Sequence, residues 1–439
     1  MFAAQRSAHF FEAALLLMAI FSSVTSILTP SQVNQGTPMH RIKTCANLVA
    51  AMTLLISSVA AQPQNNTQPE GFWRSRAAKV DTLGAAPKIR IAIWDSGVDI
   101  SLFPNQVAHN ADGLIIQMGY DAFKKRQDTP MAVLPEAILK RQSELNEILR
   151  AMDDRDSGVD SPAAKAIAAR LKRQTSDEAA EFDDVLGRWS GYVHGTGVAD
   201  IALAGNPNAE LLVARMEWWH GSPPVPCWTR ALADREAESI RAQLQFLVAN
   251  GARVVNMSWG RAERAYVSNL EACAPDMPAP ERLKLARYTV KTIRAVLIKG
   301  MKSAPNVLFV GASGNAGSTM KTANPATLFV LPNFLLVGAV DRNGAATDWT
   351  NTGPEVTLYA NGDRVRARLP GGELSFPSGT SMATPVVVNA AARVLAVIPH
   401  LTGAELKALL EQTATNNATG QPLLHPRKAL AAARKRAGG

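Results

Sequence analysis

The sequence predicts an α/β fold, in which a mostly parallel, twisted sheet has helices on both faces and a helical hairpin is inserted. Three observations lead to this prediction. Short apolar runs of strand length alternate with longer segments of helical periodicity. Several of these runs end in polar, glycine-rich turns, which is typical of parallel sheets that carry a site. One charged segment, residues 124–187, has helical patterns only.

Five apolar runs are the predicted strands, because they are short and rich in aliphatic and β-branched residues. These runs are residues 88–94, 209–216, 253–260, 306–312 and 334–340. Helices are predicted at residues 192–204, 231–249, 280–302 and 386–398. Asn250-Gly251 ends the second of these helices, since glycine adopts the left-handed conformation of a helix cap.

The segment 124–187 interrupts this alternation. Apolar residues on one helical stripe predict the first helix of the hairpin: Leu134, Ile138, Leu145, Leu149 and Met152. A second helix is predicted from Ala163 to Gln174, and the polar residues 153–158 form the break between the two. The hairpin could cap a cleft, contact a partner or bind substrate, or it could be a surface elaboration without a catalytic role.

The N-terminal residues predict export. A short basic segment, residues 39–43, precedes an apolar stretch that ends in small residues before Gln62, as in a secretory signal peptide. We therefore interpret residues 39–61 as the signal peptide, with translation starting at Met39, and residues 1–38 as an upstream extension. The alternative is a two-pass or re-entrant N-terminal anchor. The expected location is periplasmic or extracellular, with no stable membrane embedding.

The remaining boundaries follow from composition. Residues 62–87 are predicted as a linker, 88–425 as the folded domain with its insert, and 426–439 as a basic, solvated C-terminal tail. In a chain of 439 residues, 47% apolar and 19% charged residues exclude a disordered chain, a coiled coil and a collagen-like fibre. The formal net charge of +9 is mild, and no nucleic-acid-binding module accompanies it, so we expect no nucleic-acid partner.

The cysteines are consistent with an oxidising compartment. Cys45 lies in the predicted signal peptide, which leaves Cys227 and Cys273 in the mature chain. We expect these two to form a disulfide. The alternative is a pair of free, buried thiols. No Cys-x-x-Cys or Cys/His spacing typical of zinc is present, so no metal ligands are predicted.

Polar residues after the predicted strands are suited to nucleophilic catalysis. Asp95 follows the first strand, Asn315 lies in the turn after residues 306–312, and His194 and Ser381 each lie close to the start of a predicted helix. A serine hydroxyl is a weak nucleophile that needs an adjacent base, and histidine is suited to that task. A carboxylate on the second imidazole nitrogen fixes the tautomer. Unpaired N–H groups at a helix start, with an asparagine amide, can stabilise an oxyanion.

These segments resemble the subtilisin-like serine peptidases, or subtilases. The order Asp95, His194, Ser381 is the order of that family. Residues 379–385, Gly-Thr-Ser-Met-Ala-Thr-Pro, match its serine motif, residues 95–99 match its aspartate motif, and Asn315 matches its oxyanion asparagine. The segments 337–341 and 349–354 resemble the connections between the last two motifs. The similarity extends over roughly residues 88–410, apart from the insert.

The histidine motif departs from the family pattern. Gly197 stands where members usually have a second histidine, which is not the catalytic base, so the departure concerns local packing. A second Asp-Ser-Gly-Val-Asp sequence begins at Asp156. Asp95 is the preferred catalytic carboxylate, because it follows a clear strand, whereas Asp156 follows a polar helix end and is expected in an exposed turn.

The resemblance implies an exported serine endopeptidase that acts on proteins or peptides through an acyl-enzyme. It implies that Ser258, Trp259, Gly260 and Gly314 line the substrate cleft. The chemistry requires no cofactor, and structural calcium, which family members often bind, has no readable ligand cluster here. Two alternatives use the same fold: a non-catalytic peptide-binding module, and an acyltransferase that cyclises or ligates peptides.

Overall fold

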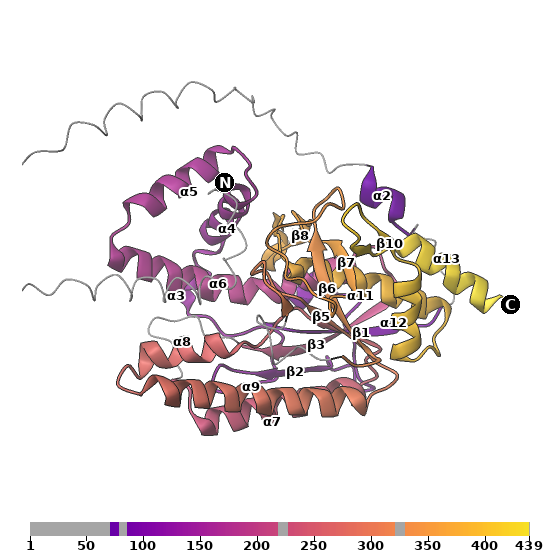
Figure 1. Ribbon diagram of the computed structural model, residues 1–439, viewed down its shortest axis with the longest axis horizontal. Coiled ribbons are helices and arrows are strands. Elements are labelled where there is room, and N and C mark those ends of the chain that lie inside the picture. The colour runs from indigo at the N-terminus through magenta and orange to yellow at the C-terminus, as the bar shows by residue number, and fades with distance from the viewer. Residues whose placement is uncertain (1–70, 79–85, 218–226, 321–329, 439) are drawn as a thin grey trace, which may run out of the picture.

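A nine-stranded sheet forms the centre of the computed structural model, which describes residues 71–78, 86–217, 227–320 and 330–438. The strand order is β10-β11-β7-β6-β5-β4-β1-β3-β2, and every pair of neighbours is parallel except β10 and β11. Helices α6, α11, α12 and α13 cover one face, and α7, α8 and α9 cover the other (Figure 1). The predicted α/β fold is therefore confirmed.

The five predicted strands are all present. They are β1 (Ile89–Asp95), β3 (Ala209–Met216), β4 (Val254–Met257), β5 (Leu308–Ala312) and β6 (Phe334–Val340). Two further strands, β2 (Gln117–Tyr120) and β7 (Leu358–Asn361), extend the sheet, and β10 (Thr415–Asn416) and β11 (Pro422–Leu423) form its edge. A separate ribbon consists of β8 (Ala367–Arg368) and β9 (Leu374–Ser375).

Long helices fill the connections between strands. They are α7 (Arg230–Ala249), α8 (Glu263–Cys273), α9 (Ala279–Lys302), α11 (Thr380–Val397) and α12 (Gly403–Gln412), with single 3₁₀ turns η3 (Ile100–Leu102) and η4 (Pro370–Gly372). Gly251, with φ of +70°, follows the end of α7 as the sequence predicts. Among the described helices, α11 alone has the length and apolarity of a membrane-spanning helix, and most of it is buried in the domain.

The insert consists of α3 (Glu136–Leu139), α4 (Gln142–Asp156) and α5 (Pro162–Arg173), and it has a small apolar core of its own. The predicted pair of helices is present, although α4 continues through residues predicted as the break. A larger difference concerns α6 (Ser176–Leu203), which begins 16 residues before the predicted helix start at Tyr192. Thr175 and Glu178 form a capping box at its start. The helix that carries His194 is thus continuous with the insert.

Both ends of the described chain correct the predicted boundaries. The short helix α2 (Phe72–Arg76) lies in the segment predicted as a linker, but it is docked on the domain: Arg76 Nη1 donates to the carbonyl of Leu424 at 3.1 Å. The predicted C-terminal tail is the helix α13 (Pro426–Ala437), whose residues Ala429, Leu430 and Ala433 are buried. Its apolar residues recur at helical spacing, which stabilises the helix against the domain. The predicted residues 1–38, the signal peptide 39–61 and Cys45 lie outside the described residues.

Candidate active site

The parallel sheet brings the candidate residues to one edge. Asp95 is the last residue of β1, Ser258 directly follows β4, and Ser313 directly follows β5. These three strands are neighbours, and their carboxyl ends therefore meet. The Asp95 side chain is fully buried, and its Oδ1 accepts hydrogen bonds from the Ser96 N–H at 2.7 Å and from His194 Nδ1 at 2.7 Å.

Helix α6 presents His194 to Asp95 from its middle, and glycine makes this approach close enough. A Cβ added at Gly195 would lie 2.2 Å from the carbonyl oxygen of Gly97 and 3.1 Å from Asp95 Oδ1. Because an ionised carboxylate only accepts hydrogen bonds, Nδ1 of His194 carries the proton. The neutral imidazole then has its basic lone pair on Nε2.

Ser381 is the second residue of α11, and Gly379, the N-cap of this helix, has φ of +153°. Two contacts join Ser381 to the end of β4: its Oγ donates to the carbonyl of Ser258 at 3.2 Å, and Ser258 Oγ donates to the carbonyl of Ser381 at 2.9 Å. Ile93 of β1 is paired with Asn256 of β4, and neighbouring strands lie about 5 Å apart. Asp95 lies two residues beyond Ile93, and Ser258 lies two residues beyond Asn256. The Ser381 hydroxyl is therefore directed at the carbonyl of Ser258, which directly follows β4, the strand next to β1.

Asn315 and the Ser381 backbone border one small space. Asn315 Oδ1 accepts hydrogen bonds from the Thr380 N–H at 2.9 Å and from Thr380 Oγ1 at 2.8 Å, which orients the amide. A Cβ placed on Gly379 would lie 3.4 Å from Asn315 Nδ2 and 3.7 Å from the Ser381 nitrogen. Because glycine leaves this space open, two N–H donors can reach an oxygen atom there.

Asn351 is a supporting residue that sequence reasoning missed. It is fully buried, its Nδ2 donates to the carbonyl of Ser313 at 2.8 Å, and its Oδ1 accepts from the N–H groups of Ala316 and Ser318, both at 3.0 Å. These bonds hold the turn that carries Asn315. The resemblance of residues 349–354 to the family marked the segment, but no local pattern distinguishes this asparagine from an ordinary turn residue.

The predicted cleft residues lie next to this site. Trp259 is buried, and its ring packs edge-on against Trp94 with centroids 5.1 Å apart, so the backbone is the part of residue 259 that can face a cleft. Gly314 has φ of +98°, and its N–H donates to Thr380 Oγ1 at 3.0 Å. The Arg261 guanidinium lies over the Trp259 ring and donates to the carbonyl of Gly260 at 3.0 Å.

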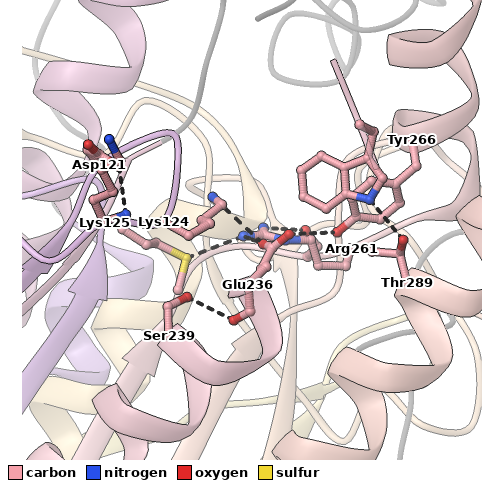
Figure 2. A network of polar contacts seen from close by, with 11 residues as sticks. Asp121, Lys124, Lys125, Glu236, Ser239, Arg261, Tyr266 and Thr289 are labelled. Carbon is pink, nitrogen blue, oxygen red and sulfur yellow. Dashed lines mark hydrogen bonds and ion pairs between the residues drawn. The ribbon is translucent and has the colours of Figure 1, made fainter. Parts of the chain in front are cut away.

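A buried charge network surrounds Glu236 and includes Arg261, which follows residues 258–260 in the chain (Figure 2). Glu236 of α7 lies 2.9 Å from Arg261 and 4.0 Å from Lys124 Nζ, and the Tyr266 hydroxyl donates to it at 3.5 Å. Burial favours the neutral acid, but the charges of Lys124 and Arg261 outweigh it and lower the pKa of Glu236. Burial lowers the pKa of Lys124, since it disfavours the ammonium form. The network holds Arg261, which donates to the carbonyl of Gly260.

The insert contacts the segment that leads to Ser381. Arg364 has an unusual positive φ of +48°, and its N–H donates to Ser378 Oγ at 2.9 Å. Its guanidinium lies 3.0 Å from Asp154 Oδ1 on α4. Beside it, Ser375 Oγ donates to Asp153 Oδ2 at 3.4 Å. The insert and the approach to the nucleophile candidate are thus joined by polar contacts.

The second Asp-Ser-Gly-Val-Asp sequence is placed elsewhere. Asp156 is the last residue of α4, where it pairs with Arg155 at 2.6 Å, and it is half-buried rather than in the exposed turn predicted for it. The structure pairs His194 with Asp95. The copy that follows a strand thus contacts His194, and the catalytic role of Asp95 stays a prediction.

The structure also tests the predicted disulfide and shows how the residue types that bind metals are arranged. Cys227 and Cys273 are bonded, with Cα atoms 5.6 Å apart, and the bond joins the residues before α7 to the end of α8. In the described part of the chain, no group of three or more His, Cys, Asp or Glu side chains is arranged to hold a metal ion.

Comparison with known proteins gives one family. The sequence model of the Subtilase family matches residues 86–427. Subtilisin E of Bacillus subtilis is 34% identical over 123 residues, which are 28% of this chain and 32% of that protein. An alkaline protease of Alkalihalobacillus alcalophilus is 30% identical over 235 residues, 52% of this chain and 50% of that protein. The chain thus spans half or less of these relatives.

Solved structures align over most of the chain at low identity. A lanthipeptide protease aligns with a TM-score of 0.47 and 15% identity, over 79% of this chain and 89% of that one. A cold-adapted subtilisin-like serine proteinase aligns with a TM-score of 0.42 and 19% identity, over 77% of this chain and 88% of that one.

Proposed function

Because the chain belongs to the subtilase family, we propose that it is an exported serine endopeptidase that hydrolyses peptide bonds through an acyl-enzyme. The observation that supports this most directly is the 2.7 Å hydrogen bond between buried Asp95 and His194, in a chain that also carries Ser381 at the start of α11. Membership of the family supports serine-type peptidase chemistry. The proposal extends it to these residues and to export.

In the proposed reaction, Ser381 attacks the carbonyl carbon of the scissile bond. Rotation of its side chain about Cα–Cβ first turns the hydroxyl from the Ser258 carbonyl toward His194 Nε2. His194 takes the proton as the C–O bond forms, and later gives it to the leaving amine. Asp95 holds the tautomer and stabilises the imidazolium that forms. Water then hydrolyses the ester by the same steps, with His194 again as the base.

Two donors are proposed to stabilise the oxyanion. The carbonyl oxygen becomes negatively charged as its carbon turns tetrahedral, and the space beside Gly379 is bordered by Asn315 Nδ2 and the Ser381 N–H. Both are fixed before reaction, Asn315 by Thr380 and the N–H by α11. Loss of such an asparagine in a subtilisin costs about 10²–10³ in rate, and that value is taken from the family.

The proposed substrates are proteins or peptides, and the chemistry needs no cofactor. The basic segment 39–43 and the apolar stretch before Gln62 support export. The disulfide is consistent with an oxidising compartment. A periplasmic or extracellular location is therefore proposed.

Substitutions at the two copies of the aspartate motif test the assignment. We expect Ser381→Ala to abolish both peptide hydrolysis and labelling by a fluorophosphonate probe. Asp95→Asn should lower kcat by about 10⁴, because the amide favours the wrong imidazole tautomer. Asp156→Asn is the matched control and should retain activity. Hydrolysis by the Ser381→Ala protein would refute the proposal, and cyclised or ligated products in mass spectra would favour acyl transfer.

A further inference from the structure

A cavity of about 290 Å³ lies in the insert, between residues of α4, of α5 and of the first part of α6 (Figure 1). Its volume is at the lower end of the range for small-ligand sites, which is about 300–1,000 Å³. We call it the insert cavity. It is separate from the candidate active site, because Asp95, His194 and Ser381 do not line it.

The deepest part of the insert cavity is apolar. Leu145 of α4 and Phe182 of α6 line it and are buried, and Val185 of α6 lines it and is half-buried. An apolar side chain that enters the cavity would leave water and contact these residues, which is favourable. The cavity is therefore suited to a ligand with an apolar group.

Two guanidiniums at the rim of the cavity form no ion pair with any residue that the structure describes. The Arg170 guanidinium lies over the Phe182 ring, 4.5 Å from its centroid. Arg173, about one turn further along α5, donates through Nε to the carbonyl of Ala169 at 3.2 Å. A guanidinium presents parallel N–H donors that match the two oxygens of a carboxylate. The rim thus offers two carboxylate-binding groups beside the apolar part of the cavity.

The other charges around the cavity favour a ligand with a single negative charge. Arg141 also lines the cavity, but it is already paired with Glu144 through two hydrogen bonds of 2.8 Å. Glu178 and Glu181 line the rim and would repel a second negative charge on the ligand. A phosphate monoester carries a charge of about −1.5 to −2 at neutral pH. A carboxylate therefore fits this rim better than a phosphate does.

Gln174 distinguishes a peptide from other apolar carboxylates. It lines the cavity and is half-buried, and its side-chain amide forms no hydrogen bond with a residue in the described part of the chain. An amide has both donors and an acceptor, which complement the C=O and N–H of a peptide group. The chain of a fatty acid would displace water from this amide without replacing its hydrogen bonds, which is costly.

We propose that the insert cavity binds the C-terminal end of a peptide whose last residue is apolar. Arg170 and Arg173 hold the terminal carboxylate, Phe182 contacts the last side chain, and Gln174 bonds the preceding peptide group. The inference goes beyond the proposed function, since binding at this cavity requires no catalysis. Hydrolysis of a peptide bond exposes a new C-terminal carboxylate, so peptides released by the proposed reaction belong to the ligand class.

Isothermal titration calorimetry of the full chain tests this site. The Ser381→Ala protein is used, so that the catalytic proposal does not affect the result. The probe is acetyl-Gly-Gly-Leu with a free carboxylate, and the comparison ligands are its C-terminal amide, octanoate and inorganic phosphate. Arg173→Gln is the test variant. Lys172→Gln is the matched control, because it removes one exposed positive charge from the neighbouring position of α5, which does not line the cavity.

We expect saturable binding of the probe that is about tenfold weaker in Arg173→Gln and within about twofold of the parent in Lys172→Gln. The amide and octanoate should each bind about tenfold more weakly than the probe, because one lacks the carboxylate and the other lacks the peptide group. Phosphate at the concentration of the probe should not displace it.

Equal affinities of the two variants would overturn the proposal, because the probe would then bind elsewhere, such as at the candidate active site. Octanoate that binds as tightly as the probe would indicate a fatty-acid site, and displacement by phosphate would indicate a general anion site; either result would overturn it as well. So would the absence of saturation at about 5 mM probe. Should thermal unfolding show that Arg173→Gln does not fold, Arg170→Gln should show the same loss of about tenfold.

Discussion

Replacing Gly195 by alanine should disable the candidate active site while Gly197→Ala, two residues along the same helix, should not. At position 195 the new Cβ would lie 2.2 Å from the Gly97 carbonyl oxygen. At position 197 the nearest atom would be the Ala367 Cβ at 3.7 Å, an ordinary contact. The two variants add the same methyl group to buried positions of α6.

The size of the effect follows from these distances. Relief of the 2.2 Å contact requires α6 and β1 to separate by about 1 Å, since carbon and oxygen rarely approach within about 3.2 Å. That shift would lengthen the 2.7 Å bond between His194 and Asp95 past hydrogen-bonding distance. A misplacement of about 1 Å costs about 10² in rate, and overpacking costs about 1–3 kcal/mol of stability. Gly197→Ala should be neutral or stabilise α6 by up to about 1 kcal/mol.

Steady-state kcat/KM on a peptide, the rate of fluorophosphonate labelling, and thermal unfolding measure these effects together. The unfolding curve shows whether each variant is folded, so that a loss of rate can be assigned to geometry. If Gly195→Ala retained kcat/KM within about threefold of the parent at an unchanged Tm, the close approach of α6 to β1 would not be required, and the reasoning would fail.

Three further predictions concern the support of the site. Asn351→Ala should lower kcat about tenfold or more, with a smaller change in KM, because it releases the turn that carries Asn315. The substitution also removes three hydrogen bonds worth about 1 kcal/mol each. Steady-state kinetics and urea unfolding of the variant and the parent check both effects. Burial, together with nearby Asp156, raises the pKa of Asp153 to about 8. The protonated form is therefore favoured in the folded protein, so its contribution to stability is full below about pH 4 and is lost as pH rises to about 8. Asp153→Asn should gain at least about 1 kcal/mol relative to the parent between pH 5 and pH 8 in urea unfolding, and a constant difference would contradict the assignment. Replacing Cys227 and Cys273 together by serine should cost about 3–4 kcal/mol, measured by urea unfolding, and a loss below about 1 kcal/mol would show that loop closure contributes little.

The polar residues at the strand ends were the part of the candidate site that the sequence predicted best. Apolar runs followed by polar turns located Asp95 and Asn315, because parallel strands place their carboxyl ends at one edge. Features that depend on the three-dimensional arrangement of the chain could not be predicted from the sequence. The orientation of the Ser381 hydroxyl toward Ser258 and the role of Asn351 depend on contacts between residues far apart in the chain.

Two errors of the sequence analysis have a common physical cause. Helix α6 was predicted to start at Tyr192 but starts at Ser176; Gly187 and Gly191 lower the helix propensity of the missed part, and tertiary packing overrides this. The C-terminal helix was predicted as a solvated tail because of its run of basic residues, although Ala429, Leu430 and Ala433 are buried against the domain. In both segments the burial of one face decides the structure, and composition alone does not report it.

The continuity of α6 joins the insert directly to His194, the proposed catalytic base. From Ser176 to His194 the helix rises about 27 Å without interruption, so a tilt of about two degrees about its far end would move the imidazole by about 1 Å. A molecule that binds α4 or α5 and tilts α6 would therefore change the distance between His194 and Asp95. Deletion of the insert would require a new helix start close to His194, so a shortened variant would also change the helix that positions the proposed catalytic base.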